Sequence, residues 1–375
     1  MKVILYLSLL FGYIYEDSDS LIVYNDTLNI CGNHGYAIKV HISDNAQLVI
    51  RQATGAPDST GWLHLFAPLI TIDDSSSIEG SGKGYRGGYM NSHPWGYGPG
   101  GGSAGGVSGG AGGGGAYGGN GGTGGDYYGG AGGTPYGDPT DTIVQMGSGG
   151  GAGRLSVVIS NGGHGGAALS LRGSLVQLIS SLVKNSGQNG ETGAGLEASG
   201  GGAGGGVIIW ADTVMMHTAT IEAAGGNGGD AAFGGGGGGS GGRIKILFSS
   251  SLDTSGVTYQ VQGGTGGIGD PGLPGSTDGD TGTIHIDIFT GINEMVSVGG
   301  LIFHVQPNPT RGTVDITTKA APLTIKIFDI AGRLVNSLYL VDERETVDLS
   351  NLRGGVYFMS VGNSPTKPYK IVLLD

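Results

Sequence analysis

The sequence predicts an all-β protein, with a glycine-rich body folded as a β-solenoid or parallel β-helix and a C-terminal antiparallel β-sandwich of the immunoglobulin-like type. Short runs of β-branched residues recur along the chain, and no apolar period of 3.6 residues persists over two turns. Five segments of the body can be superimposed as copies of one repeat. The 84 glycines among 375 residues gather between these copies. An irregular β-sandwich made from the same strands is the alternative for the body.

The first element, residues 1–17, has the features of a signal peptide. Met1-Lys2 gives a positive start, the apolar stretch Val3–Tyr15 follows, and acidic residues end it. This stretch has the length of a signal-peptide core and is too short to span a bilayer. A small-residue cleavage site is missing, and a first buried strand is the alternative. Cys31 is the single cysteine, so it cannot form an internal disulfide, and we expect it to be buried.

The second element, residues 18–297, is the body and contains the repeat. Full copies begin at Gly61, Gly166, Gly206 and Gly242, and a partial copy begins at Gly282. A unit of this length cannot bury its own apolar face, so neighbouring copies must stack. The alternating side chains expected to share one core are Leu63 and Leu65, Leu169 and Leu171, Ile244 and Ile246, and Ile284 and Ile286.

Glycine tracts separate the copies, at about Gly96–Gly153, Gly200–Gly206 and Gly234–Gly242. They could be mobile linkers, or extended threefold helices that pack closely because no side chain intervenes. The tracts follow equivalent strands, which favours ordered packing on one side of the body. We expect less order in Gly100–Gly133, because no strand anchors its middle.

The charge distribution excludes two classes of partner. The net charge is −12, and the chain from Gly300 onward contributes eight basic and seven acidic residues. The rest of the chain therefore holds ten basic and 23 acidic residues. An acidic, glycine-rich body disfavours binding to nucleic acid and to anionic membrane surfaces.

Several sequence motifs of catalytic and phosphate-binding sites occur in this chain, and its high glycine content is enough to produce them by chance. Gly82–Gly87 fits GxGxxG, but no helix follows to hold a phosphate. Gly101–Gly105, Gly106–Gly110 and Gly238–Gly242 fit GxSxG without the helix of a nucleophile elbow. We therefore predict no catalytic residue, no cofactor and no enzymatic activity.

Two acidic groups could still carry chemistry. Asp73 and Asp74, with Glu79 nearby, could serve a polysaccharide-cleaving β-helix enzyme, although a solvated turn is the plainer interpretation. The second group, Asp270, Asp278 and Asp280, could hold a calcium ion, but its residues lack the spacing of a known calcium-binding loop. The eight histidines form no HxH, HxxxH or HExxH pattern, so no metal site is predicted.

Aromatic residues are interspersed through the longest glycine tract. Their rings could stack on sugars or on partner proteins, which would make the body a carbohydrate-binding module, or they could pin the loops to the wall of the body. These residues are Trp95, Tyr97, Tyr117, Tyr127, Tyr128 and Tyr136.

The third element, residues 298–375, carries four motifs in order. The residues that define them are Pro307, Asn308, Pro309, Gly312, Asp329, Gly332, Leu352, Gly355, Tyr357 and Lys370. Together they resemble the type A sorting domain of the type IX (Por) secretion system. Alternating apolar residues in the same segment, such as Ile325 and Ile327, independently predict a small antiparallel sandwich.

The resemblance implies export. It implies recognition by the type IX outer-membrane machinery and its sortase, and commonly removal of the domain with attachment of the body to a surface glycolipid. The leading hypothesis is a secreted or surface-bound, non-catalytic structural or adhesive protein, with a glycolipid or an extracellular polysaccharide as a further partner. The alternatives are a β-helix polysaccharide-degrading enzyme and a carbohydrate-binding surface module.

Overall fold

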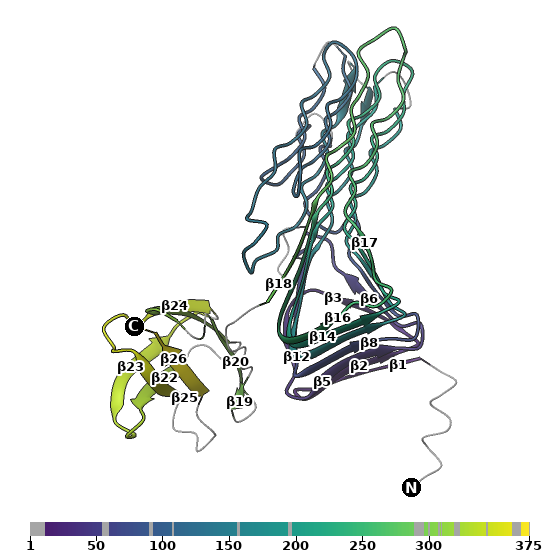
Figure 1. Ribbon diagram of the computed structural model, residues 1–375. Helices are drawn as coiled ribbons and strands as arrows, with labels where there is room; N and C mark the ends of the chain where they lie inside the picture. The colour runs from purple at the N-terminus through teal and green to yellow at the C-terminus, as the bar shows by residue number, and fades with distance from the viewer. Residues whose placement is uncertain are drawn as a thin grey trace.

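The computed structural model of the protein consists of strands and connecting segments, with no helix in the part of the chain that it describes (Figure 1). The all-β prediction is therefore confirmed. No segment in the described part forms a long apolar helix that could cross a bilayer. The described residues are 12–54, 60–89, 93–106, 109–155, 158–193, 197–288, 296–298, 301–306, 308, 310–318, 323–342, 344–361 and 369–374.

The body contains two large sheets. The strands of the first are β1 (Tyr13–Glu16), β2 (Ser20–Tyr24), β4 (Gly32–Gly35), β5 (Lys39–Ser43), β7 (Trp62–Phe66), β8 (Leu69–Ile72), β12 (Ala168–Ile179), β14 (Gly206–His217), β16 (Arg243–Asp253) and β18 (Thr283–Ile288). The strands of the second are β3 (Thr27–Ile30), β6 (Gln47–Ile50), β9 (Ser77–Glu79), β13 (Leu182–Lys184), β15 (Thr220–Glu222) and β17 (Thr258–Gln260). A separate hairpin joins β10 (Gly153–Leu155) to β11 (Val158–Ser160).

Equivalent strands of successive repeat copies pair in parallel and in register. Leu169 of β12 lies opposite Val207 of β14, which lies opposite Ile244 of β16, which in turn lies opposite Ile284 of β18. Strands β13, β15 and β17 stack in the same way in the second sheet. Because each side chain lies above its equivalent in the next copy, inward-facing residues form continuous columns.

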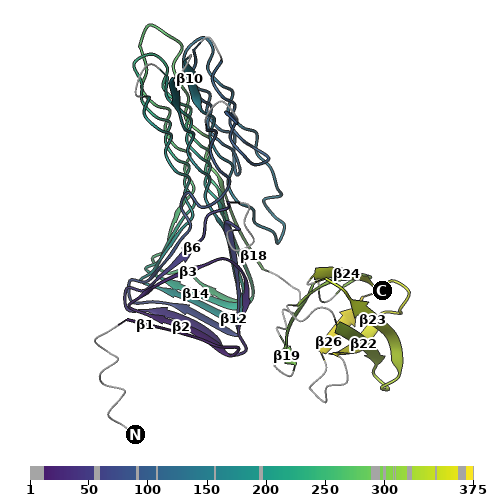
Figure 2. The same cartoon turned by 180° about the vertical axis from the view of Figure 1, so that it is seen from behind.

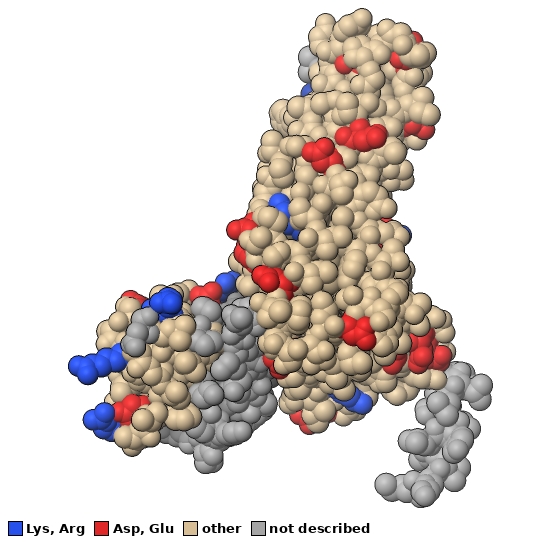
Figure 3. All heavy atoms as spheres, viewed as in Figure 1, with Lys and Arg blue, Asp and Glu red and all other residues tan. Residues whose placement is uncertain are grey.

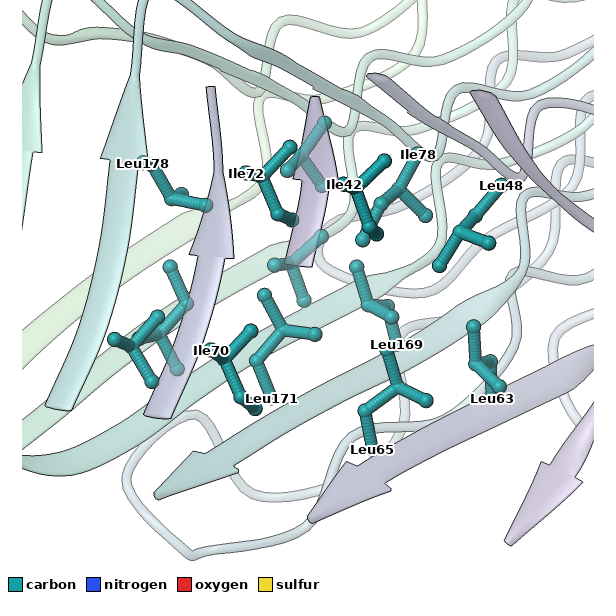
Figure 4. Packing of buried hydrophobic residues seen from close by; sticks show 14 of the residues in the cluster. Ile42, Leu48, Leu63, Leu65, Ile70, Ile72, Ile78, Leu169, Leu171 and Leu178 are labelled. Atoms are coloured by element: carbon teal, nitrogen blue, oxygen red, sulfur yellow. The ribbon is translucent and has the colours of Figure 1, made fainter. Parts of the chain in front are cut away.

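These columns form the core of the body (Figure 4). Leu63, Leu169 and Ile244 are fully buried, as expected from the alternation. Each such side chain contributes about 1.5–3 kcal/mol relative to an exposed one. The expectation for the last copy is wrong, because Ile284 and Ile286 are 44% and 43% exposed. Strand β18 is the last of the described strands in this sheet, so its inward side chains have a neighbouring strand on one side only.

The glycine tracts run away from the strands as long hairpins that pack into one elongated bundle (Figures 1 and 2). We call this part, within residues 84–166, 186–205, 224–242 and 262–282, the glycine bundle. Its segments are joined by backbone hydrogen bonds, such as Gly200 N to Gly151 O at 2.9 Å and Gly237 N to Gly112 O at 2.9 Å.

The close packing of the glycine bundle requires the absence of side chains. A Cβ placed at Gly114 would collide with the carbonyl oxygen of Gly238. The tract Gly100–Gly133, for which we expected less order, is packed like the others. Gly113 in its middle donates to Ser103 O at 2.9 Å and would collide with Ala131 O if it carried a Cβ.

The N-terminal segment is partly integrated into the first sheet. Strand β1 pairs antiparallel with β2, and Tyr36 Oη donates a 2.7 Å hydrogen bond to Glu16 Oε1. Burial, with the Glu16 carboxylate beside it, raises the pKa of Tyr36 far above its usual range. Part of the predicted signal peptide 1–17 therefore forms a strand, while residues 1–11 lie outside the described residues. Cys31 is half-buried, not buried as expected.

The C-terminal unit has two four-stranded antiparallel sheets. One contains β19 (Val296–Val298), β20 (Leu301–Gln306), β21 (Thr313–Thr318) and β24 (Arg344–Asp348). The other contains β22 (Leu323–Asp329), β23 (Leu334–Leu340), β25 (Gly355–Val361) and β26 (Tyr369–Leu373). Val314 and Ile316 from the first sheet share a core with Ile325 and Ile327 from the second. Strand β19 spans the predicted boundary between residues 297 and 298 and pairs with β20, so it belongs to this unit.

Candidate functional site

The glycine motifs with catalytic patterns are packing elements of the bundle. Within the GxGxxG segment, Gly84 and Gly87 face the carbonyl oxygens of Gly166 and Gly162 at distances that leave no room for a Cβ. Ser240 of the third GxSxG match is buried, and its Oγ accepts a 2.9 Å hydrogen bond from Tyr117 N. A nucleophile needs an exposed hydroxyl beside a base, so Ser240 does not form a nucleophile elbow.

The acidic candidates have separate structural partners. Asp73 Oδ2 lies 3.4 Å from His41 Nε2, Asp74 has a positive φ of 51° in a turn, and Glu79 Oε1 accepts a 2.7 Å hydrogen bond from Ser81 N. A carboxylate pair that cleaves a glycosidic bond must face one sugar from two sides. Asp73 instead lies beside His41 of β5, Glu79 binds the backbone amide of Ser81, and Asp74 lies in the turn between β8 and β9.

The aspartates weighed for calcium each bind a backbone or side-chain amide. Asp270 Oδ1 accepts from Gly272 N at 2.7 Å, and Asp280 Oδ2 accepts from Asn120 Nδ2 at 2.8 Å. Asp278 Oδ1 accepts from Gly266 N at 2.8 Å. Within the described residues, no three His, Cys, Asp or Glu side chains come together as a metal site would require.

The tract aromatics divide into two groups. Tyr117 and Tyr136 pack against each other with ring centroids 4.9 Å apart, and burial raises the pKa of Tyr117 to about 12. The ring of Tyr97 stacks on His93 at 3.7 Å. Tyr117 and Tyr136 also contact Arg243 of β16, which agrees with the interpretation that the aromatics pin the loops to the body, whereas Tyr97 stacks on a residue of its own loop. Trp95 is 58% exposed and is available for contacts.

Tyr127 and Tyr128, the other exposed aromatics of the tract, lie at the far end of the glycine bundle, where three turns meet. We call residues 125–129, 230–235 and 268–275 the distal turns (Figure 1). Gly125 N donates to Gly235 O at 2.8 Å, and Asp126 N donates to Pro274 O at 2.8 Å, which ties the first turn to the other two. The large side chains exposed there are Tyr127 (73%), Tyr128 (57%), Phe233 (40%) and Ile268 (73%).

A segment that sequence reasoning did not single out covers the outer face of the first sheet. We call residues 137–146 the strap. Lys245 on β16 lies beneath it with a fully buried side chain, and its Nζ donates to the carbonyl oxygens of Asp138 and Ile143, both at 2.7 Å. The same ammonium pairs with the carboxylate of Asp141. Burial lowers the pKa of Lys245, and the Asp141 carboxylate opposes this shift.

Two arginines bind the strap, one at its start and one in its middle. Arg243 donates from one guanidinium nitrogen to Tyr136 O at 3.0 Å and Gly137 O at 3.2 Å, and it lies 5.3 Å from the Tyr117 ring centroid. Arg172 donates to Thr142 O at 3.1 Å. The sequence contained a signal for this surface, because these cations occupy outward positions of otherwise apolar strands.

A cavity of about 530 Å³ remains between the strap and the strands β7, β12 and β14. Trp62, His64 and Phe66 line one wall. Burial and the nearby Arg172 charge lower the pKa of His64 to about 4, so its imidazole is neutral at neutral pH. The described residues that line the cavity include the hydroxyl-bearing Tyr85 and Ser170 and the imidazole of His64, but no carboxylate and no thiol.

The motif residues of the C-terminal unit build its turns and core. Asn308 is buried, and its Oδ1 accepts from Val372 N at 2.8 Å. Asp329 Oδ1 accepts from Arg333 N at 2.9 Å, a bond that lowers the Asp329 pKa, and Gly332 in this turn has a φ of 78°. Tyr357 Oη donates to Arg353 O at 2.8 Å.

The remaining motif residues have similar structural roles. Gly312 O accepts from Leu349 N at 2.6 Å, and Leu352 packs against the core. Gly355 begins β25 with a φ of 157°, and Lys370 pairs with Phe358 through the backbone of β26. Pro307 and Pro309 lie outside the described residues.

Comparison with known proteins explains this arrangement. Residues 304–373 match the family of secretion system C-terminal sorting domains. The C-terminal unit is a type IX secretion sorting domain. The resemblance predicted from the sequence is therefore confirmed, and it indicates export to the surface or the medium through the type IX machinery. No curated protein and no solved structure matches the chain significantly.

Proposed function

We propose that the protein is a non-catalytic structural or adhesive protein of the cell surface, in which a β-solenoid body presents the glycine bundle as a rigid rod. The type IX sorting domain indicates the export route. The stacked, in-register strands favour the solenoid over the irregular sandwich, and the two sheets of the C-terminal unit favour an immunoglobulin-like sandwich. The main support for a structural role is the backbone hydrogen bonding within the glycine bundle, which makes the bundle rigid.

Rigidity follows from how the bundle is held together. A free glycine-rich chain is a flexible coil, but here tracts far apart in sequence are joined through their backbones. Gly163, for example, donates to Gly200 O and Gly112 donates to Ala198 O, both at 2.9 Å. No tract can bend without breaking bonds to its neighbours, and the strap fixes the bundle to the sheet through Lys245.

The distal turns supply a contact surface at the end of this rod. They expose two tyrosines, a phenylalanine and an isoleucine. The face of the bundle seen in Figure 3 carries few charged residues, most of them acidic. Tyrosine rings present an apolar face with a polar tip, which suits stacking on sugar rings. We propose an extracellular polysaccharide as the partner, because Asp126, Asp230 and Asp270 in the turns disfavour an anionic surface.

Export also requires an N-terminal signal, which we place at residues 1–17. Cleavage after Asp17 would remove β1 and, with it, the β1–β2 pair and the Tyr36–Glu16 hydrogen bond. We further propose that the sortase of the same system removes the C-terminal unit and attaches the body to a surface glycolipid. An N-terminal sequence of the secreted protein that still contains Tyr13–Glu16 would contradict this placement of the signal.

The enzyme alternative receives less support. Asp73 is paired with His41, and Glu79 is bound to a backbone amide. The carbohydrate-binding module shares its evidence with the adhesive role, because both depend on the exposed rings of the distal turns.

The experiment compares cell adhesion and polysaccharide pull-down for the full chain and a variant with Tyr127, Tyr128, Phe233 and Ile268 replaced by serine. We expect the variant to lose binding. Trp95→Ser is the matched control, because it removes an exposed ring outside the distal turns and should bind normally. Equal binding by the fourfold variant would refute the contact surface. Release of sugars that Asp73→Asn abolishes would refute the non-catalytic role.

A further inference from the structure

The first sheet ends on a strand with an unprotected edge and an exposed inner face. Among the described strands, β18 pairs only with β16. Its inward positions continue the core columns: Ile284 and Ile286 lie opposite Ile244 and Ile246, which are fully buried. Natural proteins usually protect such an edge with Pro, Lys or a bulge, and Thr283–Ile288 contains none of these.

We propose that two copies of this protein pair antiparallel through the free edge of β18, about a twofold axis at Ile286. Residues opposite one another in such a pair have numbers that sum to a constant. With Ile286 opposite itself, Ile284 lies opposite Ile288 of the second copy. All three isoleucines of each strand then face the same side and continue the core across the axis.

The two polar residues on the outer face of β18, His285 and Asp287, favour this register over its neighbours. On the outer face, His285 of one copy lies opposite Asp287 of the other, and the symmetry makes this contact twice. Within one chain, His285 Nε2 and Asp287 Oδ2 are already 3.9 Å apart, so both side chains extend along the same face. Directly opposed His and Asp side chains are favourable cross-strand neighbours.

The neighbouring symmetric registers are unfavourable. An axis at His285 would place two imidazoles opposite each other, and an axis at Asp287 would place two carboxylates opposite each other. The two carboxylates would repel each other, and the two imidazoles would each lose the carboxylate acceptor that Asp287 offers in the proposed register. If the axis lay between two residues, each isoleucine of one copy would lie opposite a residue from the polar outer face of the other copy. The end of the hydrophobic core would then remain exposed.

The pairing would produce an isologous dimer, in which the same surface of both copies is buried. It would close the exposed end of the core and remove the free edge without a further strand. This inference is independent of the adhesive role, because the distal turns take no part in it.

The test measures the mass of the full chain in solution by sedimentation equilibrium at micromolar concentration. We expect a dimer, and we expect Ile286→Lys to be a monomer that still unfolds in a single cooperative transition, at a lower denaturant midpoint because the stabilisation by association is lost. Ile268→Lys is the matched control, because this isoleucine is also exposed but lies in the distal turns, and it should remain a dimer. A monomeric parent protein, a dimeric Ile286→Lys variant or a monomeric Ile268→Lys variant would overturn the proposal.

A charge exchange tests the register. His285→Asp would oppose two carboxylates at each contact and should raise the dissociation constant roughly tenfold. The double variant His285→Asp/Asp287→His restores opposite partners in this register alone and should return the dissociation constant to the parent value. A double variant as weak as His285→Asp would overturn the antiparallel pairing at Ile286.

Discussion

Replacing Gly236 by alanine tests the packed glycine bundle directly. Gly236 is buried, and a Cβ on it would lie well inside 3.0 Å of the carbonyl oxygen of Ser199. The strands carrying Ser199, Gly229 and Gly236 are joined by hydrogen bonds from Gly236 N to Gly229 O at 2.9 Å and from Gly229 N to Ser199 O at 3.0 Å. A Cβ forces these strands apart. Leaving two buried backbone groups without partners costs about 2–5 kcal/mol in the free energy of unfolding.

The matched control is Gly275→Ala, because a Cβ there meets nothing within 4 Å. This change should be neutral or stabilise by about 0.4–1 kcal/mol, since it restricts the unfolded chain. Urea unfolding followed by tryptophan fluorescence measures both effects, because all three tryptophans, Trp62, Trp95 and Trp210, lie in the body. If Gly236→Ala changed the free energy of unfolding no more than Gly275→Ala does, the close packing of the glycine bundle would be refuted.

Other parts of the molecule give four more predictions, which concern the strap, the strand core, a buried carboxyl group and the sorting domain. Lys245→Met leaves the strap carbonyls and Asp141 without their donor. It should lower the free energy of unfolding, measured by urea titration, by about 2–4 kcal/mol. An unchanged urea midpoint would show that the strap does not depend on Lys245. Ile246→Asp buries an unpaired carboxylate in the core and should abolish the cooperative unfolding transition. Burial and Asp126 raise the pKa of Glu197 to about 7, above its unfolded value of 4.5, so stability should fall as pH rises from about 4.5 to 7. The Glu197→Gln variant should lose this pH dependence of the free energy of unfolding. If the variant and the parent showed the same pH dependence, the assignment to Glu197 would be wrong. A chain without residues 298–375 should stay in the periplasm of a host with the type IX system, and its undiminished appearance at the surface would rule out the sorting role.

The strand core was predictable because its signal lies in the side chains. Alternating residues such as Leu169 and Leu171 mark the inner face, and the repeat spacing sets their register with Val207 and Ile209. The sorting motifs were predictable for a related reason: Asn308 and Gly332 make specific turn and core contacts that require those residue types.

The partners of each glycine tract were not predictable. Every tract offers the same amides and carbonyls, so nothing in the sequence distinguishes Gly238 from any other neighbour of Gly114. The strap was missed for the same physical reason, because Lys245 and Arg243 bind mainly backbone carbonyls, which every residue has. The exposure of Ile284 follows from its place at the end of the sheet, which a local pattern cannot encode.

The strap also determines when the glycine bundle can become stable during folding. The bonds from Lys245 to Asp138, Asp141 and Ile143 join residues 107, 104 and 102 positions apart. Contacts between residues so far apart form late, because the intervening chain must first lose its freedom. The strap can contact Arg172 of β12 across only 30 residues, but its bonds to Lys245 must wait until β16 is in place.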